Sequence, residues 1–167
     1  MQIEITKGQH DDTTLVIRGD GSIARFRFPK KGPIPHDAVH FVVESELEMK
    51  RGFWGLVADG MDPEAVGTMA AAAGHASANR AAAPDDSIVE LLQAERLVEC
   101  FEAESWSGDA DDEGIMAMAE AGWSASYVPA PEEVREKTGA IRAGIMAFSQ
   151  EWRDVAVGAS MTLNWKE

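Results

Sequence analysis

Two histidines and a glutamate are spaced so that a helix would bring their side chains together. His36 and His40 are four residues apart in the string HDAVH, and Glu44 follows one further turn along. Residues at positions i and i+4 share one face of a helix, so both imidazoles would reach a single ion. Two neutral imidazoles and a carboxylate suit zinc or another late first-row divalent metal. The spacing therefore predicts His36, His40 and Glu44 as metal ligands and a divalent metal such as zinc as the cofactor.

Asp37 occupies the position at which a helix of this kind carries its general base. The string HDAVH resembles a shortened form of the zinc-peptidase motif HExxH, in which a glutamate follows the first histidine. Aspartate is one methylene shorter than that glutamate, and no recognisable third-ligand motif follows in the sequence. We therefore expect Asp37 to act as a catalytic base, or to orient a ligand, in a metal-dependent hydrolase.

The same polar residues also fit an amphipathic helix that holds no metal. On a helical wheel they fall within an arc of about 120°. Val39, Phe41, Val42 and Val43 lie largely outside this arc. A polar side of this kind is usual for a helix at a protein surface. A solvated or ion-paired helix face is therefore the alternative interpretation of the histidine pair.

The segment that carries these residues continues with two aromatic residues between glycines. PHDAVHFVVE followed by GFWGLVA resembles a segment of a family of uncharacterised bacterial proteins. The resemblance covers about residues 33 to 60 and implies no activity. Phe53 and Trp54 are candidates for lining a pocket beside the histidines. A tight helix-to-helix corner packed on the core is the alternative for these two residues.

The strands and helices that must position these residues are predicted from two kinds of pattern. Apolar and polar residues alternate in the strands, and residues typical of turns and of helix starts mark where the elements begin and end. Period-two alternation of apolar residues marks three N-terminal runs and one C-terminal run. Asp20 and Gly21 predict a hairpin turn, because both residue types tolerate positive φ. Gly74 and Gly122 are expected to end two of the helices between the runs. The sequence predicts one α+β domain over residues 1–167, a small antiparallel sheet of about four strands packed against about five helices. The alternating residues are Ile3 and Ile5, Leu15 and Ile17, Ala24, Phe26 and Phe28, and Ala159, Met161, Leu163 and Trp165.

Two groups of acidic residues in the second half of the chain have spacings that are also found at metal sites. Residues 109–120 are similar to an EF-hand calcium loop, although Glu113 stands where aspartate or asparagine is usual. The alternative is a short helix whose first-turn acids offset the positive end of its dipole. Glu95, Glu99 and Glu102 form a carboxylate row on a predicted long helix, and we expect this row to face solvent.

Composition and charge exclude several classes of partner. The chain has 167 residues and a formal net charge of −14, from 15 Lys and Arg against 29 Asp and Glu. Residues 85–136 hold 15 acidic and 2 basic side chains, whereas residues 1–56 hold 8 of each. This excess argues against binding to nucleic acid or to an anionic membrane. The single cysteine, Cys100, forms no internal disulfide, and no apolar run approaches the roughly 18 residues of a membrane span. We therefore expect a cytoplasmic protein.

Two classes of function remain open on these patterns. A non-catalytic interaction or homo-oligomeric protein would use the acidic helices or the second face of the sheet. A divalent-metal-binding protein or metal-dependent hydrolase would use the histidine helix. The charged helix faces favour the first class, and the spacing of the histidines favours the second.

Overall fold

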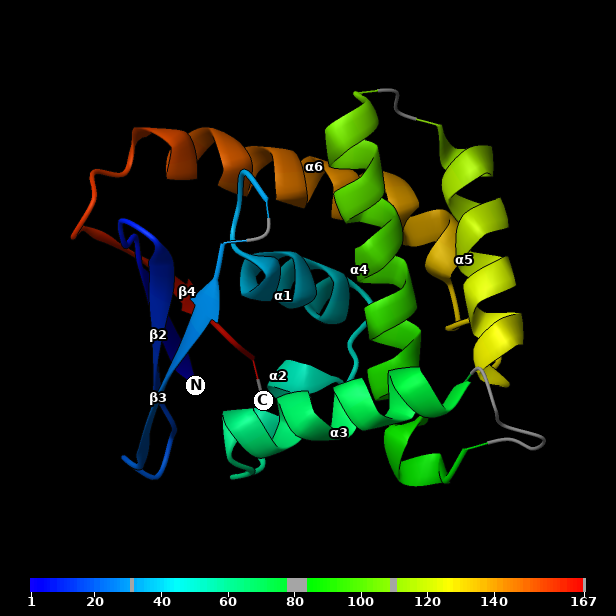
Figure 1. The fold of residues 1–167 in the computed structure, drawn as a ribbon, viewed down its shortest axis with the longest axis horizontal. Coiled ribbons are helices and arrows are strands. Elements are labelled where there is room, and N and C mark those ends of the chain that lie inside the picture. The colour runs from blue at the N-terminus through cyan, green and yellow to red at the C-terminus, as the bar shows by residue number, and fades with distance from the viewer. Residues whose placement is uncertain (31, 78–83, 109–110, 167) are drawn as a thin grey trace.

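A four-stranded antiparallel sheet forms one side of the molecule in the computed structural model (Figure 1). The structure describes residues 1–30, 32–77, 84–108 and 111–166, without the side chains of 73–77. The strands are β1 (Gln2–Thr6), β2 (Asp11–Ile17), β3 (Ile23–Pro29) and β4 (Ser160–Asn164), and their order in the sheet is β3-β2-β1-β4. The predicted sheet of three N-terminal strands and one C-terminal strand is confirmed.

The sheet buries the face of β2 that carries polar residues. Leu15 and Ile17, whose spacing marked this strand, are half-buried on the opposite face. Thr14 faces inward instead, because its hydroxyl donates a hydrogen bond to Asp37 in the helical layer. The alternation therefore predicts the strand but does not select its buried face. The buried residues of β2 are Asp12, Thr14 and Val16.

The predicted hairpin turn between β2 and β3 is present. Gly21 has a φ of 83°, in the left-handed region that glycine tolerates. The backbone N–H of Arg18 donates to the carbonyl of Ser22 at 3.0 Å and closes the turn. The turn brings Arg18 to the end of the sheet nearest the helical layer, where its side chain reaches α2.

The described helices cover the inner face of the sheet, and α1 lies in the middle of them (Figure 1). It packs against α4, α6 and α2. The structure has one short helix beyond the five or so expected, because the residues after Gly52, expected as a tight corner packed on the core, form the buried helix α2. The helices are α1 (His36–Glu46), α2 (Phe53–Ala58), α3 (Pro63–Ser77), α4 (Val89–Ser107), α5 (Asp112–Ser126) and α6 (Val134–Asp154), and a 3₁₀ turn (Asp86–Ile88) precedes α4.

Neither glycine that was expected to end a helix does so. Gly74 lies within α3 and Gly122 within α5. Glycine inside a helix costs about 1 kcal/mol relative to alanine, which tertiary packing readily outweighs. In α5 that packing comes from Trp123, which is 1% exposed and donates its indole N–H to the Gln93 carbonyl. The expected helix ends at these two glycines were therefore wrong.

The calcium-loop interpretation does not agree with α5. Asp109 lies outside the described residues, but the positions from Asp112 onward are helical. The Asp111 carboxylate accepts a hydrogen bond from the Glu113 backbone N–H and so caps the helix. The first-turn acids are those of an ordinary helix start.

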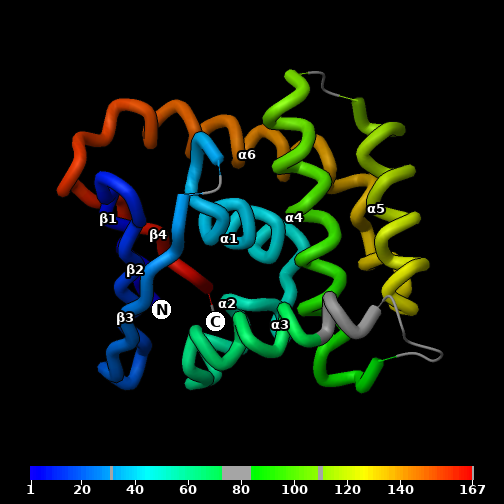
Figure 2. The backbone as a smooth tube through the Cα atoms, in the orientation of Figure 1, coloured from blue at the N-terminus to red at the C-terminus, as the bar shows by residue number. Residues whose placement is uncertain are grey.

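The two ends of the chain meet in the sheet, as Figure 2 shows. The Met1 amino group donates to the Trp165 carbonyl at 3.0 Å, and β4 pairs with β1 along its length.

Cys100 is buried in α4, and this burial raises the pKa of its thiol to about 11. None of the described helices combines the length and the apolar character needed to cross a membrane.

Candidate metal centre

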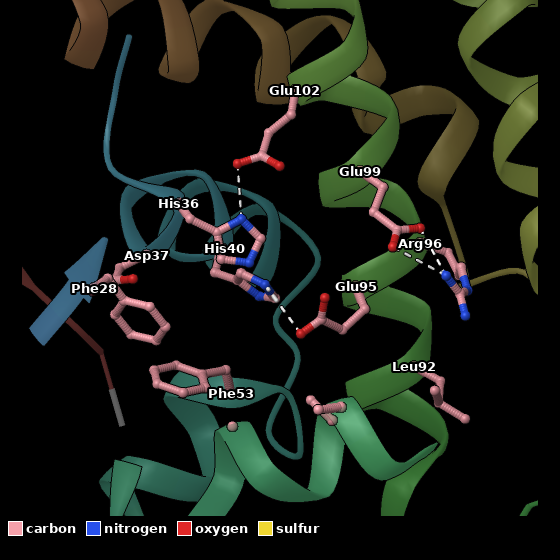
Figure 3. Close-up of a pocket in the computed structure, with 13 residues that line it drawn as sticks. Phe28, His36, Asp37, His40, Phe53, Leu92, Glu95, Arg96, Glu99 and Glu102 are labelled. Carbon is pink, nitrogen blue, oxygen red and sulfur yellow. Dashed lines mark hydrogen bonds and ion pairs between the residues drawn. The ribbon is translucent and has the colours of Figure 1, made fainter. Parts of the chain in front are cut away.

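A cavity of about 620 Å³ opens between α1, α3 and α4 (Figure 3). Its walls are of two kinds. Aromatic and small side chains from β3, α2 and α3 form one wall, and charged side chains of α4 form the other. The histidines of α1 lie between them. The lining residues are Phe28, His36, Asp37, His40, Phe53, Gly67, Ala70, Ala71, Leu92, Glu95, Arg96, Glu99 and Glu102.

The histidine pair predicted from the sequence is assembled by α1. The helix begins at His36, directly after Pro35, so both histidines lie on helical backbone. Their rings are 4.7 Å apart between centroids and inclined by 72°. His40 is only 2% exposed. The polar side of this helix therefore faces the interior of the protein, which does not agree with a solvated face. Both histidines contact carboxylates, so the ion-paired form of the alternative agrees with the structure.

Each imidazole is held at Nδ1 by a carboxylate. His36 Nδ1 lies 2.8 Å from Glu102 Oε1, and His40 Nδ1 lies 2.9 Å from Glu44 Oε1. Metal-ligating histidines in proteins typically have such a partner on the ring nitrogen that does not bind the metal. The Nε2 atoms of both rings are therefore the nitrogens available for an ion.

The third residue of the group comes from α4, not from α1. Ligand atoms of His36, His40 and Glu95 all lie within 4.8 Å of one another. His40 Nε2 and Glu95 Oε1 are 3.6 Å apart (Figure 3). Two atoms that bind a tetrahedral zinc ion at about 2.0 to 2.1 Å are about 3.3 Å apart. The three side chains thus need only small movements to enclose one ion.

Glu44 lies outside this group because backbone donors occupy its carboxylate. It is fully buried, and it accepts hydrogen bonds from the N–H groups of Phe53 at 3.0 Å and Trp54 at 2.8 Å. Together with the contact to His40 Nδ1, these bonds engage both of its oxygens. The structure therefore brings two of the three predicted ligands together and places the third behind them.

Asp37 lines the cavity next to the histidines. Its Oδ2 accepts a hydrogen bond from the Thr14 hydroxyl at 2.9 Å, whereas its Oδ1 has no hydrogen-bond partner among the described residues. Burial raises the pKa of Asp37 to about 6, although the bond from Thr14 and the nearby His36 and His40 act in the opposite direction. The role of Asp37 as a base or an orienting residue stays a prediction.

The electrostatic environment of the cavity favours a cation. Burial alone would lower the pKa of His40, but the hydrogen bond to Glu44 and the neighbouring carboxylates, including Glu95, raise it above its ordinary value. Among the described residues of the lining, Arg96 is the one arginine or lysine, and its guanidinium pairs with Glu99 at 2.8 Å. An ion that enters the cavity therefore meets an excess of negative charge.

Of the two aromatic residues proposed as pocket lining, the structure places one at the cavity. Phe53 lines it, and its ring lies 6.0 Å from that of His40. Trp54 is fully buried behind it and donates its indole N–H to the Asp37 carbonyl at 3.0 Å. Trp54 therefore supports the start of α1 rather than the wall of the cavity.

Sequence reasoning missed the part that α4 plays in this site. Glu95 and Glu102 were expected in a solvated row, but their side chains are only 25% and 28% exposed and both contact the histidines. The seven-residue spacing of these glutamates, two helical turns, was the available signal that they share a face. Only Glu99 of the row is mainly exposed, at 54% of its side chain.

No protein-family model, curated protein or solved structure matches the chain. The resemblance of residues 33 to 60 to a bacterial family stays a prediction.

Proposed function

We propose that this protein binds one divalent transition-metal ion through His36, His40 and Glu95. The observation that carries the proposal is the double support of the histidines, each bonded at Nδ1 to a carboxylate of its own. One ligand atom from each histidine and one from Glu95 lie within 4.8 Å of one another beside a negatively charged cavity.

The ligand types indicate which metals fit. Two imidazoles and one carboxylate are found around catalytic zinc and around non-haem iron(II), and they also accept nickel and manganese. A site with three protein ligands leaves coordination positions open, whereas structural zinc sites usually fill all four with protein groups. The proposed centre is thus of the open kind and faces the cavity.

An open centre beside a cavity supports the class of metal-dependent hydrolases. A bound divalent metal lowers the pKa of a coordinated water to near 7. The cavity volume of about 620 Å³ is within the range of sites for small molecules. Asp37 lines the same cavity and would serve as the general base or as an orienting group.

Metal titration of the purified protein tests the proposal. We expect zinc, nickel or manganese to bind with a Kd below about 10 μM by calorimetry, since three preorganised ligands support affinity of that order. His40→Ala and Glu95→Gln should weaken binding by at least about 100-fold, because each removes a ligand. His10→Ala, at an exposed histidine, and Glu136→Gln, at an exposed glutamate outside the cavity lining, are the matched controls. A wild-type protein that binds none of these metals would overturn the proposal.

The second class of function, a homo-oligomeric interaction protein, stays a prediction with one supporting observation. Trp106, in the last turn of α4, is 70% exposed. Exposed tryptophans are frequent among the residues that dominate protein interfaces. Light scattering over a range of concentrations would show a mass above that of one chain, and Trp106→Ala would reduce it. A single chain at all concentrations would remove the homo-oligomeric form of this class, and pull-downs that return no partner would remove the rest.

A further inference from the structure

Glu44 occupies a place that connects α1 to the first turn of α2. Its Oε1 accepts the Phe53 N–H at 3.0 Å and contacts His40 Nδ1 at 2.9 Å, and its Oε2 accepts the Trp54 N–H at 2.8 Å. Each oxygen thus faces an N–H that can only donate. Both oxygens of the Glu44 carboxylate are therefore engaged by N–H groups of α2 and by the imidazole of His40.

The close approach of α2 to this carboxylate depends on Gly52. A Cβ atom on Gly52 would lie 2.5 Å from Glu44 Oε2 and 2.6 Å from its carboxyl carbon. These contacts are well inside van der Waals distance, and the carboxylate has no free space to move into because it is fully buried. The glycine at this position is therefore required by the side chain of Glu44, and φ at Gly52 is an ordinary −71°.

A carboxylate that accepts at His40 Nδ1 determines where the imidazole carries its proton. An ionised carboxylate has no hydrogen to donate, so Nδ1 must be the protonated nitrogen. In the neutral ring the lone pair then lies on Nε2, the atom that faces Glu95. Neutral imidazole binds a metal only through the nitrogen that lacks the proton.

We infer that Glu44 is a positioning residue that fixes the Nδ1–H tautomer of His40, and that Gly52 and the first turn of α2 hold Glu44 in place for this purpose. The inference rests on the proposed metal centre for its functional meaning. The inference explains why the two halves of the segment at residues 33 to 60 belong together. The first half supplies His40 and Glu44. The second half supplies Gly52 and the backbone N–H groups of Phe53 and Trp54, which hold Glu44. Glu102 is in the equivalent position at His36 Nδ1.

Nitrogen-15 chemical shifts of the histidine rings in the metal-free protein test the inference directly. They are recorded in alkaline buffer, where the imidazoles are neutral and the two tautomers give different shifts. We expect His40 of the wild type to be protonated at Nδ1. In Glu44→Gln, the amide has one acceptor and one donor and cannot accept from both α2 N–H groups and from His40. The His40 shifts should therefore move toward the Nε2–H form, and zinc affinity should fall about 10- to 100-fold.

Two further variants separate this role from a general effect on stability. Gly52→Ala leaves all charges in place but displaces the carboxylate, so it should change the His40 shifts in the same direction. Glu46→Gln makes the same chemical change on the same helix, away from the histidines, and should change neither the shifts nor zinc binding. Circular dichroism and thermal melting establish that each variant is folded.

The outcomes distinguish this inference from the metal proposal itself. A wild-type His40 protonated at Nε2, or a Glu44→Gln protein that keeps the Nδ1–H form with wild-type zinc affinity, would overturn the positioning role even if metal binds. A wild-type protein that binds no metal would end the proposed function, and the tautomer measurement would still decide what Glu44 does to His40. The wild-type spectrum gives this answer even if a variant fails to fold.

Discussion

Asp37 is the residue near the cavity whose hydrogen bonding is least complete. It is 3% exposed, and of its two carboxyl oxygens only Oδ2 has a partner among the described residues, the Thr14 hydroxyl. A carboxyl group in such surroundings is more easily protonated than one in water, which is why burial raises its pKa to about 6. Strongly perturbed carboxyl groups in cavities are frequent at functional sites. Asp37 therefore combines a cost in stability with a position useful for proton transfer.

Replacing Asp37 with asparagine should change how stability depends on pH. The pKa of Asp37 in the folded protein is above its ordinary value of 3.8, so ionisation opposes folding as the pH rises from about 4 to about 6. In the metal-free protein, Asp37→Asn should gain about 3 kcal/mol of unfolding free energy relative to wild type between about pH 4 and about pH 8. Urea unfolding at both pH values measures this. Asp59→Asn, at an exposed position, is the control; equal pH dependence of Asp37→Asn and wild type would contradict the prediction.

At the scale of elements, α2 depends on the contacts at its two ends. It has only six residues, and a helix of that length is not stable alone in water. Glu44 accepts from its first N–H groups. At the other end, Arg18 Nε donates to the Val57 carbonyl at 2.6 Å, and Arg18 Nη2 donates to the Met61 carbonyl at 2.7 Å. A side chain from the sheet thus holds the helix that supplies Phe53 to the cavity.

Loss of the Arg18 contacts should destabilise the protein measurably. Arg18→Ala leaves two carbonyls without their charged donor, and we expect it to lower the free energy of unfolding by about 1 to 3 kcal/mol. Arg18→Lys should recover part of this loss, because an ammonium group does not have the planar fork that reaches both carbonyls. Urea unfolding measures both variants. Arg25→Ala, on the exposed side of β3, is the control, and a loss no larger for Arg18→Ala than for Arg25→Ala would contradict the role of Arg18.

The elements themselves could be predicted from local patterns, since alternation, turn residues and helix-start residues act over a few positions. This is why the four strands and the hairpin at Gly21 are confirmed. The helix ends at Gly74 and Gly122 could not be predicted, because packing of residues such as Trp123 overrides the local preference of glycine.

In the candidate site, too, the residues of one helix could be predicted from the sequence, whereas the residues that come from other elements could not. His36 and His40 belong to one helix, so their spacing alone predicts that they meet. Glu95 and Glu102 join them from α4, and their orientation depends on how α4 packs against α1. Glu44 had the right residue type and spacing for a ligand, but α2 packs against it and takes both of its oxygens. Such contacts depend on tertiary structure: the spacing of Glu95 and Glu102 indicates that they share a face, but not that this face meets α1.

At the scale of the whole molecule, charge is divided between the sheet and the helices. The segment 85–136, with 15 acidic and 2 basic side chains, contains α4 and α5. Arg142 of α6 pairs with Glu104 and Asp112 across these helices, and the bond to Glu104 raises the pKa of its guanidinium further. Contact between two copies through the acidic helices would place like charges together. An oligomer formed through Trp106 of α4 should therefore be weaker at low ionic strength, where this repulsion is not screened.

The C-terminal strand should contribute strongly to global stability. Trp165, directly after β4, is 7% exposed, and its ring lies 6.1 Å from that of Phe41 in α1. Trp165→Ala should therefore cost about 3 to 5 kcal/mol, as is typical for the loss of a buried aromatic side chain. Thermal and urea unfolding test this, with Lys166→Ala at the neighbouring exposed position as control. A loss below about 1 kcal/mol would mean that the strand is held by its backbone bonds alone.

The pairing of the last strand with the first also has a consequence for how the chain folds. β1 lies inside the sheet, between β2 and β4, yet β4 begins at Ser160 and is synthesised after α1 to α6. Until β4 emerges from the ribosome, one side of β1 is an edge with unpaired N–H and C=O groups. The hairpins and helices depend on nearer contacts and can form earlier. Completion of the sheet is then a late event, and a nascent chain stalled before β4 would carry an open edge that invites pairing with another chain.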